Sequence, residues 1–339
     1  MKRLMERIRR GMQPPPAVPP VEAQAQRQAD GAQDRQAHAQ ADGPADGQAD
    51  GQTDGHAGAN GARYVVTDIG GKHYRMESDD DYLDHIRGTF EPHMVELFDT
   101  LLAPSDTVLD IGANIGCTSI LFGSRARRVV SFEPSPTTYR LLEKNVRAAD
   151  LHNVSLNNVG LGKEAGRFEL TFSANNRSGG FVSNRISASA GHQVEAIEIA
   201  CGDDFLDQAG IDEVDFIKID VEGFERDVIE GLRKTLAVFE PTVTLELNHW
   251  CLNVLQRTSV PDFFDFLRGV FPCLYAVDLD DIRNLHDADD AYHVMFSHVV
   301  GGFKYPNIVG AFDPRRLAAF GARFGRQIVA RQVAGRQAG

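Results

Sequence analysis

A run of seven residues, DIGANIG at 110–116, has the side chains and glycine spacing of a ligand-binding loop between a strand and a helix. The apolar residues before it would bring Asp110 to the end of a buried strand. Gly112 allows the backbone to turn tightly beside a ligand, and Gly116 lets the next helix pack closely with its N-terminus toward that ligand. Ala113 and Asn114 complete the predicted turn.

The glycine spacing distinguishes between two kinds of ligand. A dinucleotide loop has the pattern G-x-G-x-x-G, which sets bare backbone against a pyrophosphate. Here the pattern is G-x-x-x-G, with an acid at the strand end. S-adenosylmethionine carries no phosphate, but it has an ammonium and a sulfonium group that an acid attracts. The loop therefore predicts an S-adenosylmethionine site, with a plain strand-to-helix turn as the alternative.

A second acid, Glu133, follows the next predicted strand, 23 positions after Asp110, and Pro134 comes directly after it. A carboxylate about 20 residues beyond the glycine loop, at the tip of the neighbouring strand, can accept hydrogen bonds from both ribose hydroxyls. A single glutamate after a strand is more often simply solvated. Its spacing from the loop favours the ribose contact, and so an adenosyl site.

Ionisable residues alternate along the run DFIKIDVEGFE at 215–225. Strand periodicity places Lys218 and Asp220 on one side, with Glu222 just beyond them. Charged groups at the end of an apolar strand are costly to leave unpaired. They either form a structural lysine–carboxylate pair, or they bind the ligand, orient an acceptor hydroxyl or take up its proton. We predict the second.

The run TLELNHW at 244–250 ends the following predicted strand, on what would be the opposite wall of a cleft. His249 could act as a general base because its unperturbed pKa is near 6.5. A hydrogen-bonded structural histidine agrees equally well with the sequence. The acids of this run and of 215–225 are also compatible with a divalent metal, which the sequence neither requires nor excludes.

Alternating strands and helices would position these residues. Gly-turned strands within 163–212 interrupt the alternation. The pattern is typical of a Rossmann-like α/β fold, with a mostly parallel sheet, helices on both faces and ligands at the carboxyl ends of the strands. Apolar runs predict seven core strands, at 107–111, 128–132, 154–159, 214–220, 242–248, 273–277 and 294–300.

The two ends of the chain differ from this core. Residues 1–61 contain a tetrapeptide repeat and too few apolar side chains to offset ordering entropy, which predicts a disordered low-complexity leader. The predicted folded domain spans 62–310, with a hairpin and helical cap at 62–103 and the catalytic core at 104–300. Residues 311–339 form an arginine-rich tail, either an amphipathic helix packed on the domain or a partly ordered end.

Composition narrows the function classes. The 339 residues are 42% hydrophobic and 24% charged, typical of a soluble globular protein. A net charge of −13 argues against a nucleic-acid binder. The four cysteines are well separated, which favours free thiols in a reducing compartment. No apolar run reaches the roughly 18 to 20 residues of a membrane span. We therefore predict a cytoplasmic protein without stable membrane insertion.

Together, DIGANIG, FEPSP, the asparagine-rich third strand and IKIDVEGFE resemble the FkbM-type methyltransferases, over roughly residues 104–250. These are class I S-adenosylmethionine-dependent enzymes, many of which methylate hydroxyls of polyketides or sugars. The resemblance implies that the 110–116 loop surrounds the methionine part of the cofactor and that Glu133 holds the ribose. It also implies that the segment from Asn158 meets the adenine, although residues 159–162 lack the acid common there in the family.

The sequence and the resemblance thus predict a methyltransferase acting on a hydroxyl of a sugar, polyketide or related small molecule, with Lys218, Asp220, Glu222 and His249 as catalytic residues. One alternative is a nicotinamide-dependent oxidoreductase on the same fold, which the missing third glycine disfavours. Another is a non-catalytic docking protein of a glycan or polyketide pathway, which the acids at 110, 133 and 220 disfavour.

Overall fold

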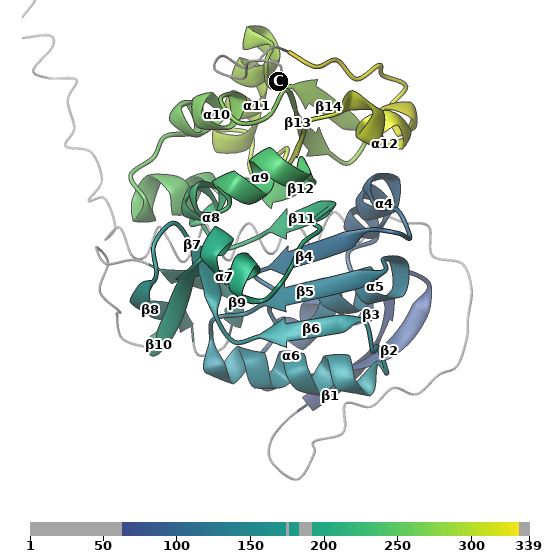
Figure 1. Ribbon diagram of the computed structural model, residues 1–339, viewed down its shortest axis with the longest axis vertical. Helices are drawn as coiled ribbons and strands as arrows, with labels where there is room; N and C mark the ends of the chain where they lie inside the picture. Colours follow the sequence, from purple (N-terminus) through teal and green to yellow (C-terminus); the bar gives the residue numbers. More distant parts are fainter. Residues whose placement is uncertain (1–62, 174–175, 183–191, 332–339) are drawn as a thin grey trace, which may run out of the picture. The chain divides into compact units, whose positions relative to one another are not determined.

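The structure is a computed structural model that describes residues 63–173, 176–182 and 192–331. Its centre is an eight-stranded sheet in the order β14-β13-β15-β12-β11-β4-β5-β6 (Figure 1). In chain order these strands are β4 (Thr107–Ile111), β5 (Arg128–Phe132), β6 (Val154–Asn157), β11 (Phe216–Ile219), β12 (Thr242–Glu246), β13 (Cys273–Asp278), β14 (Asp281–Asn284) and β15 (Asn307–Ala311).

The sheet is mostly parallel. Neighbouring strands from β6 through β5, β4 and β11 to β12 all run parallel. β15 lies antiparallel between β12 and β13, and β14 pairs antiparallel with β13 at the edge. The strand order reverses between β4 and β11, and ligands bind at such a switch point beyond the carboxyl ends of the strands. The predicted Rossmann-like α/β class is confirmed. Six of the seven expected strands are present, and β14 and β15 complete the sheet.

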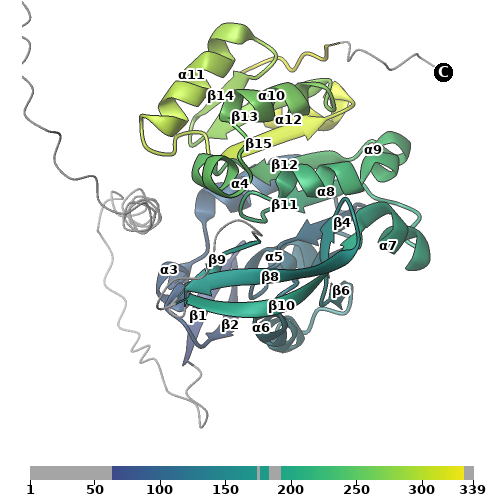
Figure 2. The same ribbon diagram turned by 90° about the vertical axis from the view of Figure 1, so that its left-hand side faces the viewer.

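Helices cover both faces of the sheet (Figures 1 and 2). Successive side chains of a strand point to opposite faces, so Val108 and its neighbour Leu109 belong to two different cores. The core around Val108 is closed by α4 (Pro92–Leu101), α5 (Cys117–Arg125) and α6 (Pro136–Ala148). The core around Leu109 is closed by α7 (Gly202–Gln208), α8 (Glu225–Gly231), α9 (Arg233–Phe239) and α10 (Val260–Arg268).

The predicted strand at 294–300 is wrong, because these residues form the end of α11 (Ala288–Val299) and the turn after it. Val294 and His298 are fully buried, whereas Phe296 between them is half exposed. Strand alternation would have put all three on one face, so the spacing is helical. The position in the sheet belongs to β15, where Gly310 makes room for Phe271: a Cβ would lie 2.7 Å from its ring.

Two smaller sheets flank the central one. Within the predicted hairpin and helical cap at 62–103, β1 (Arg63–Ile69) and β2 (Lys72–Ser78) form a hairpin, with β3 (Gly88–Thr89) beside β1. The same segment contains α3 (Tyr82–His85) and α4. The predicted excursion forms a four-stranded sheet of β7 (Gly160–Gly162), β10 (His192–Cys201), β8 (Gly166–Ser173) and β9 (Asn176–Val182), in that order.

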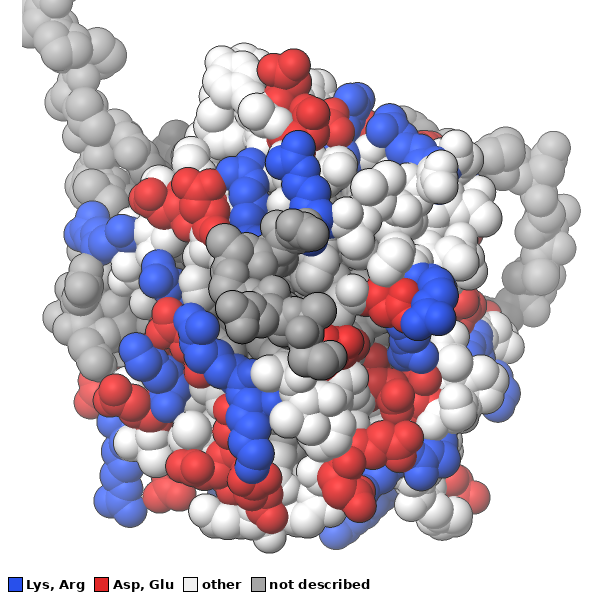
Figure 3. All heavy atoms as spheres, turned by 45° about the horizontal axis from the view of Figure 1, so that its top comes forward, with Lys and Arg blue, Asp and Glu red and all other residues white. Residues whose placement is uncertain are grey.

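Part of the C-terminal tail packs on the domain. A 3₁₀ turn, η2 (Pro314–Leu317), leads into α12 (Ala318–Arg323), and Leu317 and Phe320 are fully buried. The predicted leader and residues 332–339 lie outside the described residues. Among the helices that the structure describes, none is long and apolar enough to cross a membrane. On the face in Figure 3, acidic and basic side chains are interspersed rather than gathered into one basic surface.

Candidate functional site

Lys218, at the end of β11, connects three segments of the site. Its Nζ donates a hydrogen bond to the carbonyl oxygen of Gly112 at 2.7 Å. The same nitrogen lies 3.3 Å from a carboxylate oxygen of Asp220 and 3.6 Å from one of Asp110. Burial lowers the pKa of Lys218, but the two carboxylates outweigh this effect and hold the pKa above its ordinary value. Lys218 is therefore a charged link between the strand end and the glycine loop.

The glycine loop has the tight geometry that its sequence predicts. Gly112 has a φ of 80°, and a Cβ at this position would lie 1.8 Å from the carbonyl oxygen of Asp220. Asn114 also lies in the left-handed region, with a φ of 49°. One oxygen of the fully buried Asp110 accepts hydrogen bonds from Ser119 Oγ at 2.6 Å and Thr118 Oγ1 at 2.8 Å. Its other oxygen faces Lys218.

Glu133, just beyond β5, connects the loop after β4 to the loop after β5. Its two oxygens accept hydrogen bonds from the backbone N–H of Asn114 at 3.0 Å and of Ser135 at 2.9 Å. Burial raises the pKa of Glu133 to about 7, against the lowering effect of these two bonds. Asn158 donates from Nδ2 to the carbonyl oxygens of Glu133 and Pro134, at 2.9 and 3.1 Å. The predicted cofactor segments after β4, β5 and β6 thus form one hydrogen-bonded network.

A small cavity of about 70 Å³ lies between this network and the N-terminal cap. The loop residues 112–115 line one side, together with Lys218 and Asp220. The other side is lined by the cap residues Tyr82, Phe90, Glu91 and Met94. The cap and the glycine loop thus face each other across this cavity.

Glu91 is a member of this site that the sequence did not reveal. It precedes the first residue of α4 with φ 27° and ψ 71°, and it faces the cavity. Burial, and then the nearby Asp220, raise the pKa of Glu91 to about 7. The one signal available in the sequence is an acid placed between Phe90 and Pro92 in a mainly apolar stretch.

Beyond β11 and β12, several carboxylates gather around Asp220. Glu222, with a φ of 51°, accepts hydrogen bonds from Asn248 Nδ2 at 2.9 Å and from the Cys251 thiol at 3.4 Å. Burial and then Asp220 raise the pKa of Glu222 to about 8. Burial, Asp220 and Glu222 raise the pKa of Glu246 well above its usual range. Close carboxylates cannot all ionise together, so this cluster holds at least one proton near neutral pH.

His249 has different neighbours. Its ring packs edge-on against His298, with the ring centroids 4.9 Å apart, and lies 4.6 Å from the ring of Phe303. Burial lowers the pKa of His249. These contacts belong to the packing of α11 against the sheet, and a catalytic role for His249 stays a prediction.

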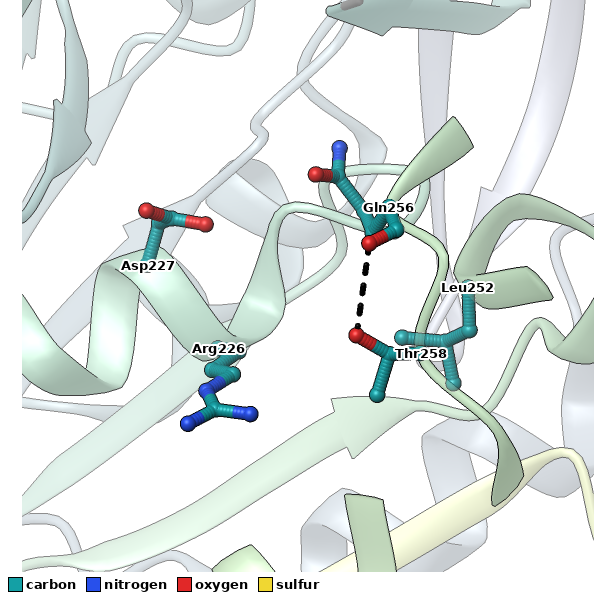
Figure 4. Close-up of a pocket in the computed structure, with 6 residues that line it drawn as sticks. Arg226, Asp227, Leu252, Gln256 and Thr258 are labelled. Atoms are coloured by element: carbon teal, nitrogen blue, oxygen red, sulfur yellow. Dashed lines mark hydrogen bonds between the residues drawn. The ribbon is translucent and has the colours of Figure 1, made fainter. Parts of the chain in front are cut away.

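A second pocket, of about 210 Å³, opens between the start of α8 and the π-helical segment η1 (Cys251–Leu255) (Figure 4). Polar side chains dominate its lining. Thr258 donates to the carbonyl oxygen of Gln256 at 3.5 Å, and Gln256 Nε2 donates to the carbonyl oxygen of Val182 at the end of β9. The lining residues are Gly223, Arg226, Asp227, Leu252, Gln256 and Thr258. Within the residues described, no cluster of three or more His, Cys, Asp or Glu side chains is arranged to hold a metal ion.

A family model described as the methyltransferase FkbM domain matches residues 110–288, which is more than half of the chain. The chain belongs to the FkbM methyltransferase family. The match begins at Asp110 and includes Glu133, Lys218 and the carboxylates after β11 and β12. The resemblance drawn from the sequence motifs is therefore confirmed.

Individual relatives are more distant. The hexuronic acid methyltransferase AglP of Haloferax volcanii is 28% identical over 136 residues, which cover 39% of this chain and 52% of that protein. Methyltransferase 1 of Beauveria bassiana is 25% identical over 154 residues, covering 40% of this chain and 62% of that protein. The chain thus spans between about half and two thirds of these relatives.

Among solved structures, the methyltransferase FkbM of Methylobacillus flagellatus aligns with 19% identity and a TM-score of 0.36. The alignment covers 50% of this chain and 38% of that one. Such a TM-score is too low to carry weight. The family model shows that the chain is an FkbM methyltransferase, and the strand order shows its fold class.

Proposed function

We propose that this FkbM-family chain is an S-adenosylmethionine-dependent methyltransferase that methylates a hydroxyl of a sugar, polyketide or related small molecule. The observation that carries the proposal is the hydrogen-bonded network that joins the glycine loop to Glu133, Asn158 and Lys218 inside the family-matched region. The loop and Lys218 also line a cavity. A family match alone would not say whether the donor site is intact.

The donor set suits the cofactor. Each oxygen of Glu133 accepts one backbone N–H and keeps lone pairs for the hydroxyls of a ribose. Asp110 and Asp220 make the neighbourhood negative, as a cationic ligand requires. A cavity of about 70 Å³ has room for only part of such a molecule, since one water needs roughly 10 to 15 Å³. The rest of the molecule would extend beyond the mouth of the cavity.

When bound, S-adenosylmethionine would supply a methyl group on a positively charged sulfur. The chain must then orient the acceptor oxygen toward that group and take up the hydroxyl proton. Glu222 is suited to holding this proton, because its pKa of about 8 lies near the working pH and Asn248 fixes its carboxylate. We assign Lys218 to positioning, since its ammonium is already engaged by Gly112, Asp110 and Asp220.

Two observations support a hydroxylated acceptor. One relative in the family is named a hexuronic acid methyltransferase. The second pocket lies beyond β11 and β12, and its lining combines the cation of Arg226 with the amide of Gln256 and the hydroxyl of Thr258. Such groups are suited to a polyol or a sugar acid.

The proposal is tested first by calorimetric titration of S-adenosylmethionine. Wild type should bind, and Glu133→Gln should weaken binding by about tenfold or more, because hydrogen bonds to a charged group are worth about 1.5 to 3 kcal/mol. Glu143→Gln, at an exposed position on α6, should bind like wild type. If Asp110→Ala and Glu133→Ala both leave binding intact, the assigned donor site is wrong.

The acceptor is tested with tritium-labelled methyl donor and a panel of hexuronic acid glycosides, neutral glycosides and hydroxylated polyketides. Label should pass to at least one of these hydroxyls. A chain that does not bind the donor would instead be a docking protein. A chain that binds NADH and changes its absorbance would be an oxidoreductase.

A further inference from the structure

We propose that Glu91 binds the ammonium group of the methionine part of the cofactor, from the side of the cavity opposite the glycine loop. The proposal rests on the proposed function, because it assumes that S-adenosylmethionine occupies this cavity. It adds a residue from the N-terminal cap to a site otherwise built from the ends of β4, β5 and β11.

The backbone at Glu91 is unusual for a glutamate. Its φ of 27° and ψ of 71° lie in the left-handed half of the map, which glycine or asparagine adopts with less strain. The surroundings hold it there: the N–H groups of Met94 and Val95 both donate to the carbonyl oxygen of Glu91 at 3.0 Å, and Phe90 N–H donates to Asp68. Strain of this kind is maintained where a side chain has a task.

The side chain of Glu91 lines the cavity and, among the described residues, accepts no hydrogen bond. The titratable groups around it are Asp220, Lys218, Tyr82 and Cys117. Among the described residues that line the cavity, Lys218 is the single basic one, and its ammonium is already engaged by Gly112, Asp110 and Asp220. Glu91 and Asp220 therefore leave an excess of negative charge facing the cavity.

This arrangement matches an ammonium better than a sulfonium. An ammonium group brings one positive charge and three N–H donors, so it can satisfy a carboxylate that lacks partners. A sulfonium brings the charge but no donor. The neighbouring loop at 112–115 is the segment assigned to the methionine part of the cofactor. A cation here would also lower the raised pKa of Glu91, so binding near pH 7 should release a proton.

The experiment is calorimetric titration with S-adenosylmethionine and with S-adenosylhomocysteine, which keeps the ammonium and lacks the positive sulfur. Glu91→Gln should weaken binding of both ligands by about tenfold and to the same extent. The matched control is Glu96→Gln, on the helix that Glu91 precedes. The Glu96 side chain is 62% exposed, so this variant should bind within twofold of wild type. Titrations in buffers of different ionisation enthalpy should show proton release for wild type and a smaller release for Glu91→Gln, in which Glu133 still titrates.

A second variant separates binding from folding. Glu91→Gly relieves the strained backbone, so its melting temperature should match or exceed that of wild type while both ligands bind more weakly. Binding by Glu91→Gln within twofold of wild type would overturn the proposal. So would weaker binding of S-adenosylmethionine alone, because the contact would then be to the sulfonium. If wild type itself binds neither ligand, the proposed function fails, a result distinguishable from a failure at Glu91.

Discussion

At the scale of single residues, Gly112 is fixed by two separate constraints. Its φ of 80° strains any other residue, and a Cβ would lie 1.8 Å from a backbone oxygen of Asp220. Backbone atoms cannot swing aside as a flexible side chain can. The glycine therefore sets the distance between the loop after β4 and the loop after β11, and so the shape of the donor site.

Gly112→Ala should destabilise the protein by more than about 3 kcal/mol and abolish donor binding, because both the strain and the clash must be relieved by moving the 220 segment. Gly71→Ala is the matched control. Gly71 has a similar φ of 84° but no atom within 4 Å of the added Cβ, so strain alone should cost about 1 kcal/mol. Urea unfolding followed by circular dichroism measures both. Equal losses in the two variants would show that the contact with Asp220 does not matter.

The site residues that the sequence revealed can be recognised from the residues next to them in the chain. Asp110, Glu133 and Lys218 each follow or end an apolar run, and the parallel sheet brings such ends together. Glu91 is different, because its importance depends on which segments pack against it. The spacing of residues in the sequence does not indicate that the start of α4 faces the glycine loop.

At the scale of elements, the N-terminal hairpin is attached to the site through Asn145 of α6. The Asn145 side chain is buried, and its Nδ2 donates to the carbonyl oxygens of Glu77 in β2 and Ile115 in the glycine loop, at 3.0 and 2.9 Å. Its Oδ1 accepts from Glu77 N–H at 2.8 Å. Sequence periodicity predicts the hairpin and the helix, but not this side chain that joins them.

The error at α11 has a physical cause. Residues 294–300 are apolar and β-branched enough for a strand, and short apolar runs do not distinguish a strand from a buried helix. The deciding feature is His298, which is fully buried and whose Nδ1 bonds the carbonyl oxygen of Lys304 at 2.7 Å. Its burial depends on the packing of α11 against the sheet, which the local sequence does not specify.

This buried histidine gives the fold a defined pH dependence. Burial lowers the pKa of His298 to about 4, against about 6.5 in the unfolded chain. Below pH 6.5 His298 is protonated in the unfolded chain but stays neutral in the folded chain. The free energy of unfolding therefore falls as pH drops from about 6.5 to about 4. At about 1.4 kcal/mol per pKa unit, the loss reaches about 3 kcal/mol. The buried carboxyls Glu133 and Glu225, with pKa values near 7, oppose this trend.

The histidine contribution is isolated by comparing wild type with His298→Met across pH 4 to 8 in urea unfolding. Wild type should be more stable than the variant above pH 6.5, and its advantage should shrink steadily toward pH 4. An advantage that stays constant with pH would mean that His298 does not titrate differently in the two states.

At the scale of the whole molecule, the C-terminal tail packs against the start of β4 and against α4. Leu317 and Phe320 are fully buried in the core that contains α4. The sequence left open whether this tail packs, because its arginines and apolar residues suit both a packed helix and an exposed end. The partner of the tail, Asp106, lies 210 positions earlier, and no local pattern connects them.

Arg316 connects the tail to the central sheet. Its guanidinium donates to both oxygens of Asp106, at 3.4 and 3.1 Å, and to the carbonyl oxygen of Asp215 at 3.2 Å. The Asp106 side chain is 1% exposed and that of Arg316 is 34% exposed. Arg316→Met would leave a buried carboxylate without its cation, so it should cost about 3 kcal/mol, the low end for a broken buried pair because solvent reaches the arginine. The adjacent Arg315→Met is the control, since Arg315 is 90% exposed, and it should not shift the urea midpoint. Equal midpoints for the two variants would show that the tail is held by its apolar contacts alone, without help from the Arg316–Asp106 pair.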